Sequence, residues 1–176
     1  FKLPLPEENI LDRKVASVIS QALSLKTSHY KSINDIDKNE WNLLFGNKGT
    51  FDWDGLALLE NSFQNNDLPE NNWKFDYVLI KDVITGNPVV ATFFTTTLWK
   101  DDMLFPAHVS ESIELKRRDD PYYFTSRVLS TGSLLTEGEH LFIDKSSVLW
   151  KDAMQLLFDQ MNILQEKYNA NSILLR

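Results

Sequence analysis

The chain has 176 residues, of which 43% are hydrophobic and 12% aromatic, so it carries enough apolar material for one folded core. Its 25 Asp and Glu outnumber its 18 Lys and Arg, and the resulting net charge of -7 argues against a nucleic-acid partner. Cysteine is absent, which excludes disulfides, a thiol nucleophile and a Cys-ligated zinc site, and which favours a cytoplasmic location. No apolar run approaches the roughly 20 residues of a membrane-spanning helix, so no membrane partner is expected.

Residues 1–27 are predicted to form a linker and an amphipathic helix, and residues 28–176 a single domain. The helix is expected to run from residue 6 to about residue 26 because apolar residues recur there on one helical face. These residues are Leu11, Val15, Val18, Ala22 and Leu25. The chain starts without methionine and stops in a short β-like run, so we expect a piece of a longer protein whose domain is truncated at its C-terminus.

Two short helices are predicted after a strand at residues 29–33. Asp37 followed by Glu40 is a helix-start pattern, in which the first side chain caps the helix and the second lies in its first turn. The second helix is expected from Trp53 or Asp54 through Phe63, and the polar stretch 64–72 after it is predicted to be a surface loop.

The centre of the chain favours strands. Residues 73–81 and 87–99 are rich in alternating, β-branched and aromatic positions, with a turn between them, and predict a β-hairpin. Residues 100–123 are expected to form a loop or a short helix. Strand-like patterns return at 123–129 and 139–143.

The strongest helical pattern covers residues 147–168, where an apolar stripe runs without interruption. A short strand at 172–175 follows it. A strand, helix, strand order favours parallel pairing of the two strands. The whole pattern predicts an α+β fold.

The order of these elements resembles the GNAT acyltransferase fold over roughly residues 30–176. The stretches 36–44 (IDKNEWNLL), 58–60 (LLE) and 131–138 (TGSLLTEG) look like predicted N-acyltransferases related to the Fem aminoacyltransferases. The resemblance implies an α/β sandwich with a central mixed, mostly antiparallel sheet flanked by helices. It also implies transfer of an acyl group from acyl-CoA to an amine. Similar domains occur beside pyridoxal-phosphate enzymes of the oxoamine synthase type in some bacterial proteins, which would place further domains in the same polypeptide.

The resemblance places the cofactor site at the start of the long helix. In the family, the pyrophosphate of coenzyme A lies on free backbone N–H groups there, and the corresponding residues are Lys145, Ser146 and Ser147. The family's glycine-rich loop is absent, because no glycine lies between Phe142 and Trp150. Serine is also an ordinary helix N-cap, so a structural interpretation of these residues stays open.

The resemblance also places the catalytic base just before or within the preceding strand. Glu137, Glu139 and His140 lie there, and a crowded or buried carboxylate would have a raised pKa suited to removing a proton from an amine. The alternative is that all three are turn and strand-surface residues.

Other reactive residue types are interpreted as structural. The charged run 116–120 precedes a proline and is expected to be a solvated loop. The three histidines are dispersed and make no metal-ligand pattern. No serine lies in a Gly-x-Ser-x-Gly sequence, so a serine hydrolase is not supported.

Two functions are compatible with these patterns. The first is an acyltransferase that moves an acyl or aminoacyl group from an activated small-molecule donor to an amine acceptor. The second is a non-catalytic GNAT-like accessory domain that docks on a larger enzyme, which the missing glycine loop and the amphipathic leading helix favour.

Overall fold

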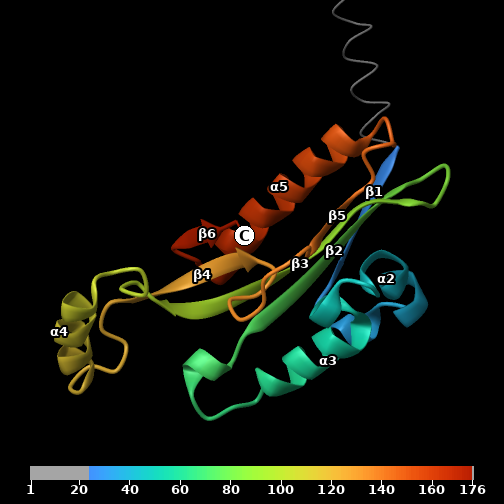
Figure 1. Cartoon of the computed structure of the whole chain (residues 1–176). Helices are drawn as coiled ribbons and strands as arrows, with labels where there is room; N and C mark the ends of the chain where they lie inside the picture. The colour runs from blue at the N-terminus through green and yellow to red at the C-terminus, as the bar shows by residue number, and fades with distance from the viewer. Residues whose placement is uncertain (1–23, 176) are drawn as a thin grey trace, which may run out of the picture.

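The computed structural model describes residues 24–175 and has a mixed α+β fold (Figure 1). The strands are β1 (Leu25–Tyr30), β2 (Lys74–Asp82), β3 (Pro88–Lys100), β4 (Thr125–Thr131), β5 (Leu141–Ile143) and β6 (Ser172–Leu174). The α-helices of this part of the chain are α2 (Lys38–Phe45), α3 (Trp53–Ser62), α4 (Ala107–Arg117) and α5 (Trp150–Tyr168). Short 3-10 turns lie at η1 (Ile33–Asp35), η2 (Gly49–Phe51) and η3 (Pro69–Asn71). The predicted α+β class is therefore confirmed.

One six-stranded sheet organises the fold, in the order β1-β2-β3-β4-β6, with β5 also paired to β3. Every pair is antiparallel except β4 and β6, which are parallel. The predicted parallel pairing of 139–143 with 172–175 is wrong, because β5 pairs with β3 and the partner of β6 is β4. Strand β4 pairs with the second half of β3, residues 94–100, and β5 with residues 90–92. Strand β2 occupies the other edge of β3. Consequently β4 and β5 follow each other along one edge of β3.

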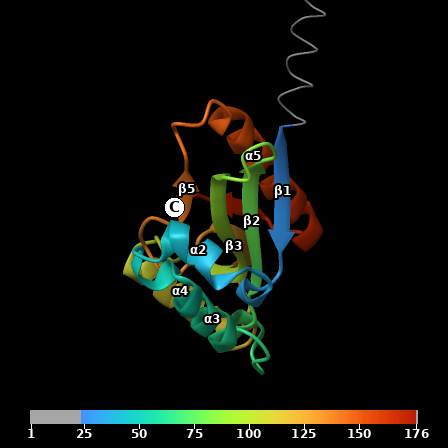
Figure 2. The ribbon, with the colours of Figure 1, turned by 90° about the vertical axis from the view of Figure 1, so that its right-hand side faces the viewer.

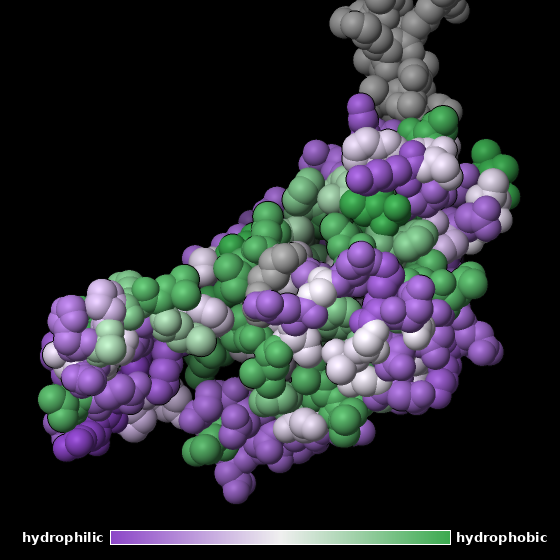
Figure 3. Space-filling model, viewed as in Figure 1, coloured by the Kyte–Doolittle hydropathy of each residue, from purple (hydrophilic) through white to green (hydrophobic). Residues whose placement is uncertain are grey.

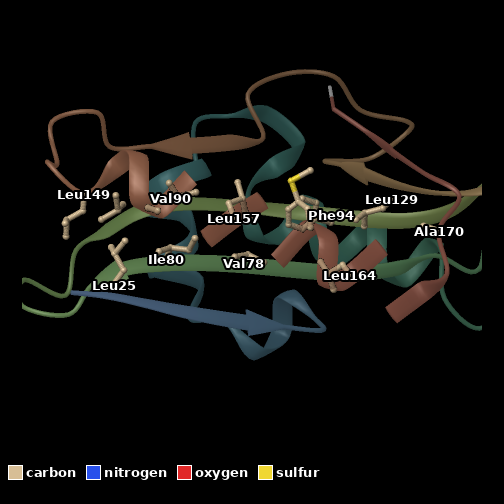
Figure 4. Close-up of a cluster of buried hydrophobic side chains, with 13 residues drawn as sticks. Leu25, Val78, Ile80, Val90, Phe94, Leu129, Leu149, Leu157, Leu164 and Ala170 are labelled. Carbon is tan, nitrogen blue, oxygen red and sulfur yellow. The ribbon is translucent and has the colours of Figure 1, made fainter. Parts of the chain in front are cut away.

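Helices cover both faces of the sheet (Figures 1 and 2). Helix α5 packs on one face, and α2 and α3 on the other. Figure 4 shows the α5 side, where Val78 of β2, Phe94 of β3 and Leu157 of α5 belong to one buried cluster. The opposite cluster includes Trp41 and Phe93, both fully buried. Because the two central strands are covered on both faces, nearly all of their residues are buried, rather than every second one.

Capping residues explain where the two short helices begin. The Asp37 side chain accepts a hydrogen bond from the Glu40 N–H at 2.9 Å, which confirms the predicted helix start. Asp52 caps α3 in the same way, accepting from the Gly55 N–H at 2.7 Å. Both caps satisfy donors that a helix leaves free in its first turn.

A buried carboxylate joins α3 to the rest of this layer. Glu60 is only 3% exposed, and its two oxygens accept hydrogen bonds from the Ser32 hydroxyl at 2.7 Å, the Ile33 N–H at 2.6 Å and the Tyr77 hydroxyl at 2.6 Å. Burial, followed by the charge of Glu60, raises the pKa of Tyr77 far above its ordinary value, so this phenol stays protonated and donates.

The connection between β3 and β4 projects from the sheet as an arm that carries α4 (Figure 1). The prediction of a solvated loop for the charged run 116–120 is wrong at Arg117, which is 7% exposed. Its guanidinium donates to Asp102 at 2.6 Å, to Glu114 at 2.7 Å and to the carbonyl of Phe124 at 3.0 Å. A long Arg side chain can be buried here because carboxylates and carbonyls surround its charge. Apolar and polar groups share the surface of the arm (Figure 3).

Strand β1 differs from its prediction. It begins at Leu25 and is preceded by a turn at Ser24, so the expected helix through residue 26 is wrong for residues 24–26, while residues 6–23 of that helix lie outside the described residues. The apolar spacing of the sequence predicted that Leu25 lies on a helical face. In the fold it pairs with Asp82 and packs into the α5-side cluster. Pairing with β2 therefore overrides the local apolar spacing.

Candidate functional site

The predicted site lies where the chain passes from β4 to β5. Residues 132–140 leave the sheet here, so that the edge of β3 is interrupted between its partners at residues 92 and 94. Four polar side chains around this interruption are almost completely buried. They are Thr95, Ser130, Ser133 and His140.

His140 is the innermost of the three predicted catalytic residues, with 5% of its surface exposed. Its ring meets Phe51 and Phe93 edge-to-face, with centroid distances of 5.9 and 6.4 Å. Nδ1 lies 3.1 Å from the carbonyl oxygen of Gly138. Because a carbonyl can only accept, this contact favours the neutral tautomer that carries its proton on Nδ1 and leaves Nε2 as the basic nitrogen.

The backbone around His140 is held from β3. The Thr92 hydroxyl donates to the His140 carbonyl at 2.9 Å, and the Thr95 hydroxyl donates to the Gly132 carbonyl at 2.9 Å. Within the loop, the Ser133 hydroxyl accepts from the Thr136 N–H at 3.2 Å. The Ser130 hydroxyl is fully buried and has no hydrogen-bond partner among residues 24–175. From the sequence, Ser130 and Ser133 could line a substrate pocket, but the Thr-Gly-Ser sequence is interpreted mainly as a turn signal. The structure buries both side chains.

Glu137 and Glu139, the other two predicted bases, are exposed. Glu139 forms an ion pair with Lys48, at the beginning of η2. Both side chains are open to solvent, so neither lies in the buried setting that the sequence argument required of a base. Of the predicted catalytic residues, His140 has the environment closest to that of a buried base.

The predicted cofactor residues lie at the other end of β5. Lys145 and Ser146 are exposed, and α5 begins at Trp150, three residues after Ser147. The Asp144 carboxylate accepts from the Ser146 N–H at 2.9 Å and from its hydroxyl at 2.6 Å, and these bonds lower the pKa of Asp144. Two donors that could contact a phosphate are thus bound to a carboxylate of the chain itself. Strand β5 spans about 10 Å between this loop and His140.

A second polar cluster, on the α5 face, was not predicted. The Asp76 side chain is fully buried in β2, 2.6 Å from His29 Nε2, and it also forms an ion pair with Lys31. The Tyr168 hydroxyl lies 3.3 Å from the same carboxylate oxygen. Burial, and then the charge of Asp76, raise the pKa of Tyr168 to about 12. The one sequence signal was an Asp inside the otherwise apolar run 75–80.

Within residues 24–175, no group of three or more His, Asp or Glu side chains is arranged to hold a metal ion. No helix of that part of the chain is long and apolar enough to cross a membrane. No protein-family model, curated protein or solved structure matches the chain.

Proposed function

We propose that this domain is an acyltransferase of GNAT-like fold, which moves an acyl or aminoacyl group from an activated donor, most simply acyl-CoA, to an amine. The observation that carries the proposal is the division of the β3 edge between β4 and β5. Strand β6 pairs with β4 only, at residues 128–130, and β5 has β3 as its single strand neighbour in the described part of the chain.

The outer edge of β5 therefore presents backbone N–H and carbonyl groups to a ligand. An extended molecule with amide groups, such as the pantetheine arm of coenzyme A, can add to such an edge as an extra strand does. One end of this edge leads to His140 and the other to Lys145 and Ser146. This arrangement suits a thioester at the histidine end and phosphates at the start of α5.

In this proposal the amine nitrogen attacks the thioester carbonyl carbon while Nε2 of His140 accepts the proton that the nitrogen loses. The new C–N bond forms, the C–S bond breaks, and the thiolate leaves and is protonated. The packing of His140 against Phe51 and Phe93 holds the imidazole in place.

The proposal is tested by following the release of coenzyme A from acetyl-CoA in the presence of a panel of amino acids and amino sugars. A thiol-reactive dye reports this release directly, because the chain has no cysteine. His140→Gln is expected to lower the rate about 100-fold or more, whereas Glu139→Gln keeps it within about twofold. Equal rates in the parent and His140→Gln would refute the base assignment.

A separate titration tests the donor site. Calorimetry with acetyl-CoA is expected to give binding by the parent that the double variant Lys145→Ala, Ser146→Ala loses. Absence of binding by the parent would instead support a non-catalytic accessory domain of a larger, multi-domain enzyme. One observation favours that second function, since the Ser146 donors are already bound to Asp144.

A further inference from the structure

Two adjoining cavities of about 350 Å³ each lie where the C-terminal end of α5 meets the sheet. The first is lined by Lys31, Gln64, Asn65, Asn72, Trp73, Lys74, Phe75 and Tyr168. The second is lined by Pro69, Asn72, Lys74, Thr96, Thr97, Leu98, Arg127, Lys167, Tyr168 and Asn169. They share Asn72, Lys74 and Tyr168, and we call the two together the α5-end groove.

The lining of the α5-end groove is cationic. It contains Lys31, Lys74, Arg127 and Lys167, and no Asp or Glu is among its lining residues. The net charge of the chain is -7, so four cations around one groove are a marked local departure from the average. Lys31 is paired with Asp76 beneath the groove, whereas Lys74 and Lys167 have no ion-pair partner in the described residues. Their charge is available to a ligand.

The end of α5 does not cancel this positive charge. A helix C-terminus carries a partial negative charge on its last carbonyl groups. Here the Tyr168 carbonyl accepts from the Arg127 guanidinium at 2.9 Å, and the Gln165 carbonyl accepts from the Ala170 N–H at 2.9 Å. Because protein donors satisfy these groups, the cations dominate the groove.

A buried hydroxyl group without a hydrogen-bond partner lies in the wall of the α5-end groove. Thr96 lines the groove, is 3% exposed, and its hydroxyl has no hydrogen-bond partner among residues 24–175. In the β2–β3 register it lies opposite Lys74. Buried polar groups are nearly always satisfied, so a hydroxyl left unpaired beside two free cations is a donor suited to a bound molecule.

We infer that the α5-end groove binds a small phosphorylated compound. A phosphate dianion, with its two charges and several acceptor oxygens, matches Lys74, Arg127 and Lys167 together with a hydroxyl donor, whereas one carboxylate would leave two of these cations uncompensated. The rest of the compound lies over the amides of Gln64 and Asn65, which suit hydroxyl groups.

This site is separate from the proposed acyl-transfer site. Thr96 lies two residues from Phe94 and therefore on the α5 face of β3, whereas the His140 ring packs against Phe93, which belongs to the cluster on the opposite face. A failure to detect acyl transfer therefore does not contradict phosphate binding in the α5-end groove. A failure to detect phosphate binding likewise does not contradict acyl transfer.

The test uses inorganic phosphate as the probe, in an NMR titration of backbone amides at fixed ionic strength. The expected result is saturable shifts at residues 72–74, 96–98, 127 and 167–169. Lys74→Glu is expected to weaken binding about tenfold, while Lys151→Glu, the same charge reversal at an exposed lysine of α5 outside the groove, leaves the affinity unchanged.

Absence of saturable shifts in the parent, or equal weakening by the two charge reversals, would overturn the inference. Thermal unfolding of both variants verifies that each is folded. Vesicles of phosphatidylglycerol separate a free phosphate compound from a lipid headgroup, and the inference predicts that they do not bind. Vesicle binding that Lys74→Glu abolishes would replace the small compound with a membrane surface.

Discussion

The imidazole of His140 lies directly against Gly132, so closely that a β-carbon on Gly132 would stand 2.9 Å from the Cγ atom of the ring. Gly132 also has φ +70, a left-handed conformation that side chains disfavour. The sequence TGSLLTEG thus has a glycine at the position where the loop turns over the histidine. Gly132 sets the place of His140 at the interruption of the β3 edge.

The variant Gly132→Ala is expected to destabilise the fold and displace the imidazole. The matched control is Gly86→Ala, since Gly86 has φ +72 but open space around its missing β-carbon. Both variants incur about 1–2 kcal/mol of backbone strain, and Gly132→Ala about 1 kcal/mol more from the contact with the ring. Urea unfolding and the NMR signals of His140 measure the two effects. Equal losses would show that the contact is unimportant.

Glu60 provides a second stability prediction. Glu60→Leu removes the acceptor of the Ile33 N–H and the Tyr77 hydroxyl, which are both buried, and should lower the free energy of unfolding by about 3 kcal/mol. Glu60→Gln keeps a carbonyl oxygen for these two donors and should lose less. Urea denaturation followed by tryptophan fluorescence compares the two. A Glu60→Leu protein as stable as the parent would contradict the role given to this carboxylate.

The elements with long periodic patterns could be predicted from the sequence. The β2–β3 hairpin and α5 each carry an apolar pattern over nine or more residues, and the structure has β2 at Lys74–Asp82, β3 at Pro88–Lys100 and α5 at Trp150–Tyr168. Local caps such as Asp37 were equally clear, because cap and first turn are neighbours in sequence.

Features that depend on distant pairing could not be predicted. Asp76, His29 and Tyr168 come together only because β1 pairs with β2 and the end of α5 lies beside them. The burial of Arg117 depends in the same way on Asp102, 15 residues earlier, at the base of the arm. The fold places His140 inside and Glu139 outside through the path of the loop, which periodicity does not specify.

The ion pair of Asp102 and Arg117 predicts an acid-dependent stability. The hydrogen bond from Arg117 is the main cause that lowers the pKa of Asp102 below its usual value of about 3.9. A folded-state pKa below the unfolded one adds stability that is complete above about pH 4 and is lost as the pH falls through the folded-state pKa. The difference in free energy of unfolding between the parent and Asp102→Asn should therefore shrink between pH 5 and pH 2.

Urea titrations at several pH values measure this difference. Asp119→Asn, which removes an exposed carboxylate of the same arm, is the control for the loss of one charge. A difference between the parent and Asp102→Asn that stays constant down to pH 2 would mean that the ion pair does not contribute to folding.

The α5-end groove predicts opposite stability effects for two threonines on the same face of β3. Thr92→Val removes a donor to the His140 carbonyl and should cost about 1 kcal/mol. Thr96→Val removes a buried hydroxyl that has no partner in the described residues, so the free energy of unfolding should rise by up to about 1 kcal/mol. The same change should weaken phosphate binding, because the valine cannot donate a hydrogen bond to the anion.

Thermal unfolding and the phosphate titration, done on the same samples, separate these effects. If the Thr96 hydroxyl stabilised the fold, its removal would lower both the free energy of unfolding and the affinity for phosphate. If the hydroxyl serves a ligand, its removal raises the free energy of unfolding and lowers the affinity for phosphate, because the unpaired hydroxyl destabilises the protein only while the groove is empty. Higher stability with unchanged affinity would exclude the Thr96 hydroxyl from the phosphate site.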